Sequence, residues 1–210
     1  MFVNHAHSAI ICGATGSGKT EFALDLLEKE YRNFFKYIII VCPTWRYNKA
    51  YLSREWLFKD HEHIFLVDPK ELVPRSDDPL NDTLKIFFES HGALDQSQVL
   101  FLIDDCSSQK GMTKKKRMLS ELAFSGRHLN CSVWILTQKY NSVLTDLREQ
   151  IKWLALFYCK DRDSFDEALR ENDVIPSSEE RKQMRNQLAK HKHSKLILIT
   201  EQPTSYRFEK

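Results

Sequence analysis

Near the start of the chain, the sequence reads Gly13-Ala14-Thr15-Gly16-Ser17-Gly18-Lys19-Thr20. This stretch matches in full the pattern G-x-x-x-x-G-K-[ST], in which a glycine-rich loop between a strand and a helix wraps around phosphate groups. Glycines allow the tight turn that points successive backbone N–H groups at the anion, and the helix adds the positive end of its dipole. We expect Lys19 to reach the β- and γ-phosphates and the Thr20 hydroxyl to bind Mg²⁺. The motif predicts that the chain binds a nucleoside triphosphate together with Mg²⁺.

Around this loop, short apolar runs recur along the chain. They are continuous rather than alternating, which is typical of parallel strands that helices bury on both faces. The runs are residues 8–12, 37–42, 64–67, 99–103, 131–136, 153–159 and 196–200. Helix-like stretches lie between them, at residues 20–31, 113–124, 162–171 and 177–190. The order predicts one α/β domain over residues 1–210, with a mostly parallel central sheet between helices.

Two segments depart from this alternation. Residues 43–80 contain several prolines, and we interpret them as an insertion or loop region around one extra strand. Residues 195–208 carry two apolar runs separated by Gln-Pro-Thr-Ser, which predicts a β-hairpin at the sheet edge. Ser177, before two glutamates, is the expected N-cap of the last helix.

Composition and charge are those of an ordinary globular protein. Hydrophobic residues make up 42% and charged residues 29% of the 210 residues, and the formal net charge is +2. That charge is too small to indicate a nucleic-acid partner by itself. Five cysteines are scattered without a C-x-x-C pair, as expected for reduced thiols in an intracellular protein rather than a zinc site. Since no secretory leader and no apolar run of ~20 residues is found, we expect an intracellular protein, neither secreted nor in a membrane.

A second part of the nucleotide site is expected where an apolar run ends in two acids, at Asp104 and Asp105. Asp104 would hold Mg²⁺ and its waters, and Asp105 would polarise the water that attacks the γ-phosphate. The alternative is that both acids lie in a solvated turn. Paired with the phosphate loop, the catalytic interpretation is favoured.

The next apolar run is preceded by Arg127 and ends in Gln138. A glutamine at the end of the neighbouring strand could contact the γ-phosphate or the attacking water and act as a sensor. Arg127 is either an arginine that faces phosphate or a surface cation that caps the preceding helix. The residues alone leave these two interpretations of Arg127 open.

Taken together, the phosphate loop, the Leu-Ile-Asp-Asp ending, Gly126-Arg127-His128, the Thr-Gln strand ending and Leu147-Arg148 resemble viral genome-packaging ATPases. These are FtsK/HerA-type motors of poxviruses, other large DNA viruses, virophages and Polinton-like elements, and the likeness covers roughly residues 8–160. The resemblance implies a RecA-like fold with an added strand between the phosphate-loop strand and the Asp-Asp strand. It also implies ATP hydrolysis that drives double-stranded DNA into a capsid, through a ring of five or six subunits at the capsid or portal vertex.

The resemblance further implies roles for single residues. Arg127 matches an arginine that enters a neighbouring subunit's site, Gln138 matches the sensor glutamine, and Arg148 matches a second arginine that acts in cis or in trans. Members often carry a proline before that second arginine, which residues 143–148 lack, and this puts the role of Arg148 in doubt.

A basic segment, Lys114-Lys115-Lys116-Arg117, follows the Asp-Asp strand. It is a solvated helix start, a nuclear localisation signal, or a loop that faces the ring lumen and contacts DNA phosphates without reading sequence.

Three other functions compete with the packaging motor. A nucleoside or nucleotide kinase has a similar length and the same phosphate loop, but the residues after the second apolar run do not map to an acceptor site. A non-packaging FtsK/HerA-type ATPase for DNA export is hard to separate by sequence. A nucleotide-dependent switch is disfavoured because Asp105 and Gln138 point to hydrolysis.

Overall fold

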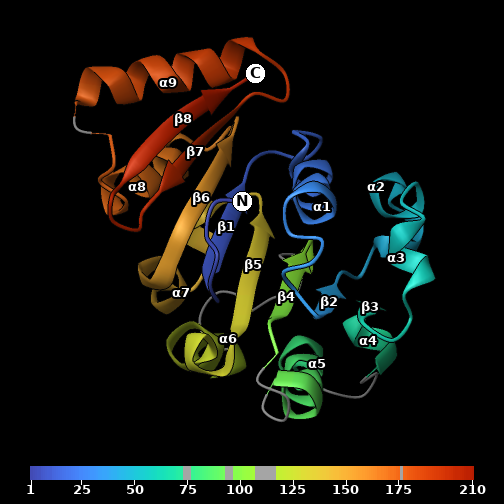
Figure 1. Ribbon diagram of the computed structural model, residues 1–210. Coiled ribbons are helices and arrows are strands. Elements are labelled where there is room, and N and C mark those ends of the chain that lie inside the picture. Colours follow the sequence, from blue (N-terminus) through green and yellow to red (C-terminus); the bar gives the residue numbers. More distant parts are fainter. Residues whose placement is uncertain (73–76, 93–96, 107–116, 176) are drawn as a thin grey trace.

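The centre of the protein is an eight-stranded sheet with the order β3-β2-β4-β5-β1-β6-β7-β8 (Figure 1). The computed structural model describes residues 1–72, 77–92, 97–106, 117–175 and 177–210. The strands are β1 (Ser8–Cys12), β2 (Tyr37–Val41), β3 (Ile64–Val67), β4 (Val99–Asp104), β5 (Cys131–Thr137), β6 (Ile151–Phe157), β7 (Lys195–Ile199) and β8 (Ser205–Glu209). All pairings among β1 to β6 are parallel, and β7 and β8 add two antiparallel strands at one edge. The predicted mostly parallel sheet and C-terminal hairpin are confirmed.

Helices connect these strands. The α-helices are α1 (Lys19–Lys29), α2 (Lys49–Leu52), α3 (Trp56–Lys59), α4 (Pro69–Leu72), α5 (Pro79–Phe87), α6 (Arg117–Ser125), α7 (Thr145–Gln150), α8 (Arg162–Glu171) and α9 (Ser178–Lys190). Short 3-10 helices are η1 (Trp45–Tyr47), η4 (Gly126–Leu129) and η5 (Tyr140–Ser142), and η2 (Phe88–Gly92) is a π-helical turn. Ser177 caps α9 by accepting a hydrogen bond from the Glu180 N–H at 3.1 Å, as expected from the sequence.

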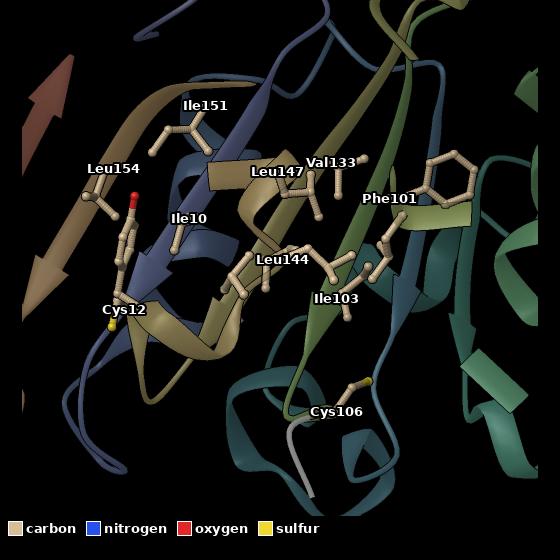
Figure 2. Close-up of a cluster of buried hydrophobic side chains, with 14 of the residues drawn as sticks. Ile10, Cys12, Phe101, Ile103, Cys106, Val133, Leu144, Leu147, Ile151 and Leu154 are labelled. Carbon is tan, nitrogen blue, oxygen red and sulfur yellow. The ribbon is translucent and has the colours of Figure 1, made fainter. Parts of the chain in front are cut away.

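Helices cover both faces of the sheet, which forms two hydrophobic cores. Successive side chains of a strand point to opposite faces, so a fully buried strand such as β1 contributes Ile10 to one core and Ile11 to the other. The first core packs under α5, α6, α7, α8 and α9, and the second packs under α1, α2 and α3. Figure 2 shows part of the first core, with Leu144 and Leu147 over the strands that carry Ile10, Val133 and Ile103. This burial on both sides is why the strands read as continuous apolar runs.

The predicted strands agree with the observed ones to within about two residues, and the main differences lie in helices that the sequence did not predict, among them the nine-residue α5. Residues 43–80 do contain the expected extra strand β3, but they also form η1, α2, α3 and α4. Helices of four residues, such as α2, are too short to show a 3.6-residue periodicity. The same holds for the six-residue α7, which the sequence did not predict. Of the expected helix at residues 113–124, the described part begins at Arg117, and residues 113–116 lie outside the described ranges.

The strand order places the functional motifs. β5 lies between β1, which leads into the phosphate loop, and β4, which ends in Asp104, as the resemblance implied for the added strand. Because β1, β4 and β5 are parallel, their carboxyl ends meet at one edge of the sheet. All five cysteines are buried thiols. Within the described ranges, no helix combines the length and apolar character required to span a bilayer.

Candidate nucleotide site

The phosphate loop connects β1 to α1 and is held by the strands on both sides. The Gly13 N–H donates to the Thr137 carbonyl of β5 at 3.1 Å, and the Ala14 N–H donates to the Tyr158 carbonyl beyond β6 at 2.9 Å. Gly18, just before α1, has φ 100°, which side chains disfavour. A Cβ atom on Gly13 would lie 2.5 Å from Cβ of Phe157. Glycine is therefore required by backbone conformation at one end of the loop and by packing at the other.

Lys19 reaches back over this loop from the first turn of α1. Its Nζ donates to the carbonyl oxygens of Gly13 at 2.7 Å and Ala14 at 3.0 Å. Burial lowers the pKa of the ammonium, and the nearby Asp104 carboxylate opposes that shift. The loop thus directs a cation to the position where the motif predicts the phosphates.

Asp104 lies at the end of β4 and is almost fully buried, with 4% of its surface exposed. Its Oδ2 accepts hydrogen bonds from the Thr20 hydroxyl at 2.9 Å and from the Tyr51 hydroxyl at 2.7 Å. Burial raises the pKa of the carboxyl, and these two donors oppose that rise. The structure therefore joins the two predicted magnesium residues, Thr20 and Asp104, by a direct contact.

The donor set around this contact fits Mg²⁺. Mg²⁺ takes oxygen ligands and commonly binds through one or two protein groups, keeping waters and substrate phosphates as the others. A hydroxyl and a carboxylate oxygen within hydrogen-bond distance, beside the phosphate loop, supply such groups. Nowhere in the described ranges do three or more His, Cys, Asp or Glu residues form a cluster suited to a metal. The site is thus suited to a metal that arrives with phosphates.

Asp105 differs from Asp104 in conformation and exposure. Its φ of 52° turns the backbone out of the strand, a conformation that aspartate tolerates better than most residues. Its side chain is exposed, and Oδ2 accepts a hydrogen bond from the Thr44 hydroxyl at 3.4 Å. The adjacent acids therefore have separate environments: Asp104 is held in the interior and Asp105 faces the open site.

A cavity of about 430 Å³ brings these residues together. Its wall includes Lys19, Thr20, Asp104, Asp105 and Gln138, from α1 and from the ends of β4 and β5. A second cavity of about 390 Å³ lies on the β6 side of the same loop and shares Thr15, Gly16 and His193 with the first. Its other wall residues are Ala14, Ser17, Phe157, Tyr158, Lys160, Leu188, Ala189, Lys190, His191, Lys192 and Ser194.

The structure places the two predicted trans arginines away from this cavity. Arg127 belongs to η4, which directly precedes β5 and so lies at the amino end of that strand, opposite the phosphate loop. Arg148 of α7 is only 9% exposed, and its guanidinium donates to Glu167 at 3.0 Å and Glu171 at 2.7 Å within the same chain. The geometry therefore commits Arg148 to an internal ion-pair network, which does not favour a role at a neighbour's site.

Only one residue of the predicted DNA-contacting segment belongs to the described residues. Lys114, Lys115 and Lys116 lie outside the described residues, and Arg117 is the first residue of α6.

The residues at the site that sequence reasoning missed include Thr44, Asn48, Tyr51 and His193. Thr44 could have been found, because it follows β2, whose carboxyl end meets that of β4. Tyr51 and Asn48 belong to the region interpreted as a loop, and His193 precedes the last hairpin. No local motif marks these three, since only folding brings them to the phosphate loop.

Comparisons with known proteins agree with this geometry. The family described as "Poxvirus A32 protein" matches residues 2–205 of the chain. The genome packaging NTPase B204 from Sulfolobus turreted icosahedral virus 2, solved with AMPPCP, has a TM-score of 0.64 at 15% identity, covering 99% of each chain. The pCW3 conjugation coupling protein TcpA, solved with ATPgS, has a TM-score of 0.54 at 13% identity, covering 97% of this chain and 60% of its own. The N-terminal domain of zonular occludens toxin from Neisseria meningitidis has a TM-score of 0.51 at 13% identity, covering 98% and 94%. No curated protein sequence matches the chain.

Proposed function

Since the chain belongs to the poxvirus A32 protein family, we propose that it is an ATP-driven motor that moves double-stranded DNA into a viral capsid. One contact carries the enzymatic part of the proposal. The Thr20 hydroxyl of the phosphate loop donates to the buried Asp104 at 2.9 Å, across the strand β5 that separates their two strands. Few arrangements other than a site for a nucleoside triphosphate with Mg²⁺ need both groups beside a loop that cradles phosphate.

Five residues that line the first cavity have distinct roles in the proposed hydrolysis: Lys19, Thr20, Asp104, Asp105 and Gln138. Lys19 and the backbone N–H groups of the loop bind the β- and γ-phosphates, and Thr20 with Asp104 would hold Mg²⁺. When bound, Mg²⁺ supplies positive charge against the phosphate oxygens. Asp105, exposed in the cavity, accepts a proton from the attacking water, and Gln138 orients that water.

The second cavity is suited to the nucleoside end of the nucleotide. The acids and Gln138 lie on the β4–β5 side of the loop, so the γ-phosphate points there and the nucleoside extends toward β6. On that side, Tyr158 is 41% exposed and offers a ring on which a base can stack. Lys160, Lys190 and Lys192 line the same cavity, and their charges favour the polyphosphate to which the nucleoside is joined.

DNA movement and ring formation rest on the family and on two of the structural neighbours. One neighbour is described as a genome packaging NTPase and another as a conjugation coupling protein, which favours a motor over a small-molecule kinase. A packaging motor passes any sequence, so we propose contacts with DNA phosphates rather than bases. A ring of five or six copies at a capsid or portal vertex inside the host cell completes the proposal. The likeness to the coupling protein keeps DNA export as the second candidate.

The experiment that tests this function measures ATP hydrolysis by the purified protein with and without double-stranded DNA. We expect hydrolysis to require Mg²⁺ and to rise with duplexes of unrelated sequence. Lys19→Ala is expected to abolish it, because the motif places this cation on the β- and γ-phosphates.

Two results would contradict the proposal. If the Lys19→Ala variant hydrolysed ATP at the wild-type rate, the nucleotide site would have to lie elsewhere in the protein. Phosphoryl transfer to a small acceptor, without any response to DNA, would indicate a kinase. Packaging and export are then separated by asking whether the protein co-purifies with assembled capsids.

A further inference from the structure

A short segment between β2 and β3 forms one wall of the nucleotide site. It comprises η1 and α2 with their flanking residues, 44–54, and none of the sequence motifs marks it. The Asn48 side chain caps α2 by accepting from the Ala50 N–H at 3.0 Å, which fixes how the chain enters this four-residue helix. Asn48, Lys49 and Ala50 line the first cavity. The segment is therefore built onto the catalytic edge of the sheet.

Tyr51 extends from α2 into the interior and ends on the carboxylate of Asp104. The side chain is fully buried, with 0% exposure, and its hydroxyl donates to Oδ2 of Asp104 at 2.7 Å. A carboxylate oxygen accepts and a tyrosine hydroxyl can donate, so Tyr51 supplies the proton of this hydrogen bond. Thr20 donates to the same oxygen, which leaves the other carboxylate oxygen outside both hydrogen bonds. Two donors from two different elements thus limit the rotation of a buried carboxylate.

Arg54, directly after α2, ties this segment to α1. Its side chain is 12% exposed and contacts Glu21 at 2.7 Å, Asp25 at 2.6 Å and Glu28 at 2.9 Å. These acids lie four and three residues apart along α1, so they share one face of the helix. α1 also carries Thr20. The Arg54 contacts therefore connect the elements that supply both donors to Asp104.

We propose that Tyr51 is a positioning residue for the magnesium-binding carboxylate of Asp104, and that Arg54 holds Tyr51 in place by clamping α2 to α1. This inference rests on the proposed function, because it assumes that Asp104 binds Mg²⁺ with the nucleotide. Tyr51 acts on Asp104 and does not contact the reacting atoms. Its loss weakens the metal-dependent part of nucleotide binding, while the phosphate loop continues to hold the phosphates.

The test compares Tyr51→Phe with Tyr31→Phe, a matched loss of a buried hydroxyl. Tyr31 is also 0% exposed, and its hydroxyl donates to the Val3 carbonyl at 3.0 Å rather than to the site. Affinity for a non-hydrolysable ATP analogue is measured with Mg²⁺ and with a chelator, and Mn²⁺ binding to the same complex is followed by electron paramagnetic resonance. For Tyr51→Phe we expect metal affinity to fall roughly 10–100-fold, as for other groups that orient a metal ligand, with unchanged affinity in the chelator. Tyr31→Phe keeps the wild-type response to metal, even where thermal unfolding shows lower stability for both variants.

The clamp is tested with Arg54→Gln, and Arg46→Gln serves as its control. Arg46 lies in the same segment and pairs with Glu71, but both side chains are half exposed. Arg54→Gln is expected to reduce metal affinity less than Tyr51→Phe does, because the Tyr51 hydroxyl is still present. Arg46→Gln is expected to leave metal affinity unchanged.

The outcomes separate this inference from the proposed function. If the affinity of the wild-type protein for the ATP analogue did not change with Mg²⁺ or Mn²⁺, the proposed site for the nucleotide and its metal would be refuted. A normal wild-type response, together with equal metal affinity in Tyr51→Phe and Tyr31→Phe, would overturn the role of Tyr51 alone. Unchanged metal affinity in Arg54→Gln would overturn the clamp.

Discussion

The carboxyl ends of the parallel strands form one edge of the central sheet and their amino ends form the opposite edge. These two edges differ in which predicted nucleotide-site residues a single chain places there. At the carboxyl edge, Lys19, Thr20, Asp104 and Gln138 surround one cavity. At the amino edge, η4 carries Arg127 before the first residue of β5. β5 has seven residues, which at about 3.3 Å per residue separates the two ends by roughly 20 Å. One edge therefore holds the groups predicted to bind the nucleotide and Mg²⁺, whereas Arg127 belongs to an element at the other edge, and we propose that this arginine serves another subunit.

The largest expected effect comes from removing that arginine. Arg127→Ala should lower kcat by roughly 10³–10⁵-fold in the assembled ring, as for other arginines that enter a phosphoryl-transfer site from a neighbour. Nucleotide affinity of the separate subunit should not change, because the arginine is far from its own cavity. The measurements are steady-state hydrolysis and nucleotide binding on the same preparation.

Mixing subunits sharpens this test. An Arg127→Ala subunit next to a Lys19→Ala subunit has an intact phosphate loop and receives the neighbour's arginine, so mixed rings should regain hydrolysis. Mixtures that assemble normally but stay inactive at every ratio would give Arg127 a local role and remove the contrast between the edges.

A smaller loss is expected within the carboxyl edge. Asp105→Asn should reduce hydrolysis by roughly 10²–10⁴-fold, the usual contribution of a general base. Nucleotide binding should be retained, because Asp105 is exposed and bonded only weakly to Thr44 at 3.4 Å. If magnesium-dependent binding falls as steeply as the rate, Asp105 belongs with Asp104 in holding the metal.

The Arg148→Ala substitution tests whether Arg148 stabilises the fold. Arg148→Ala should lower the free energy of unfolding by about 3 kcal/mol, because a mostly buried ion pair loses its cation. Glu167 and Glu171 keep 25% and 34% exposure, which holds the loss near the lower end of the range for buried pairs. Urea unfolding measures the effect. Full stability combined with lost hydrolysis would instead give Arg148 a role at a subunit interface.

The smallest effect concerns His7, a buried residue just before β1. Its Nε2 accepts from the Trp134 indole at 3.0 Å, and its Nδ1 donates to the His5 carbonyl at 2.6 Å, so the ring is neutral. Burial lowers its pKa to about 4, so between pH 6.5 and 4 the unfolded chain binds a proton that the folded chain does not. The free energy of unfolding should therefore decrease as the pH is lowered through this window, by about 2 kcal/mol between pH 7 and pH 5.

His7→Gln isolates this contribution, since glutamine does not titrate. The variant should be less stable than wild type at pH 7 but should lose less stability on acidification. Parallel pH profiles for the two proteins would show that His7 does not carry the proton linkage.

Much of the fold and of the phosphate site was predictable because it is encoded locally. Continuous apolar runs predicted β1 and β3 to the residue, since strands buried on both faces leave little room for polar residues. The phosphate loop was predictable because its glycines, Lys19 and Thr20 follow one another in the chain. The family resemblance, drawn from these motifs, is confirmed by the match over residues 2–205. By contrast, α2 was missed because four residues carry no periodic signal.

What the sequence by itself determined is the chemistry of the site: a cation and a hydroxyl in a glycine-rich loop, and acids at the end of a buried strand. Only the tertiary structure decided how these groups are oriented and which are free to act. Two acids adjacent in sequence became a buried carboxylate with two donors and an exposed one. Arg127 and Arg148 both matched arginines of the resembled family. In the structure, Arg148 forms ion pairs within its own chain, whereas Arg127 lies in η4 at the amino end of β5. The physical reason is that a residue type sets what a side chain can bond, whereas burial and partners depend on segments distant in sequence, such as α2 and α8.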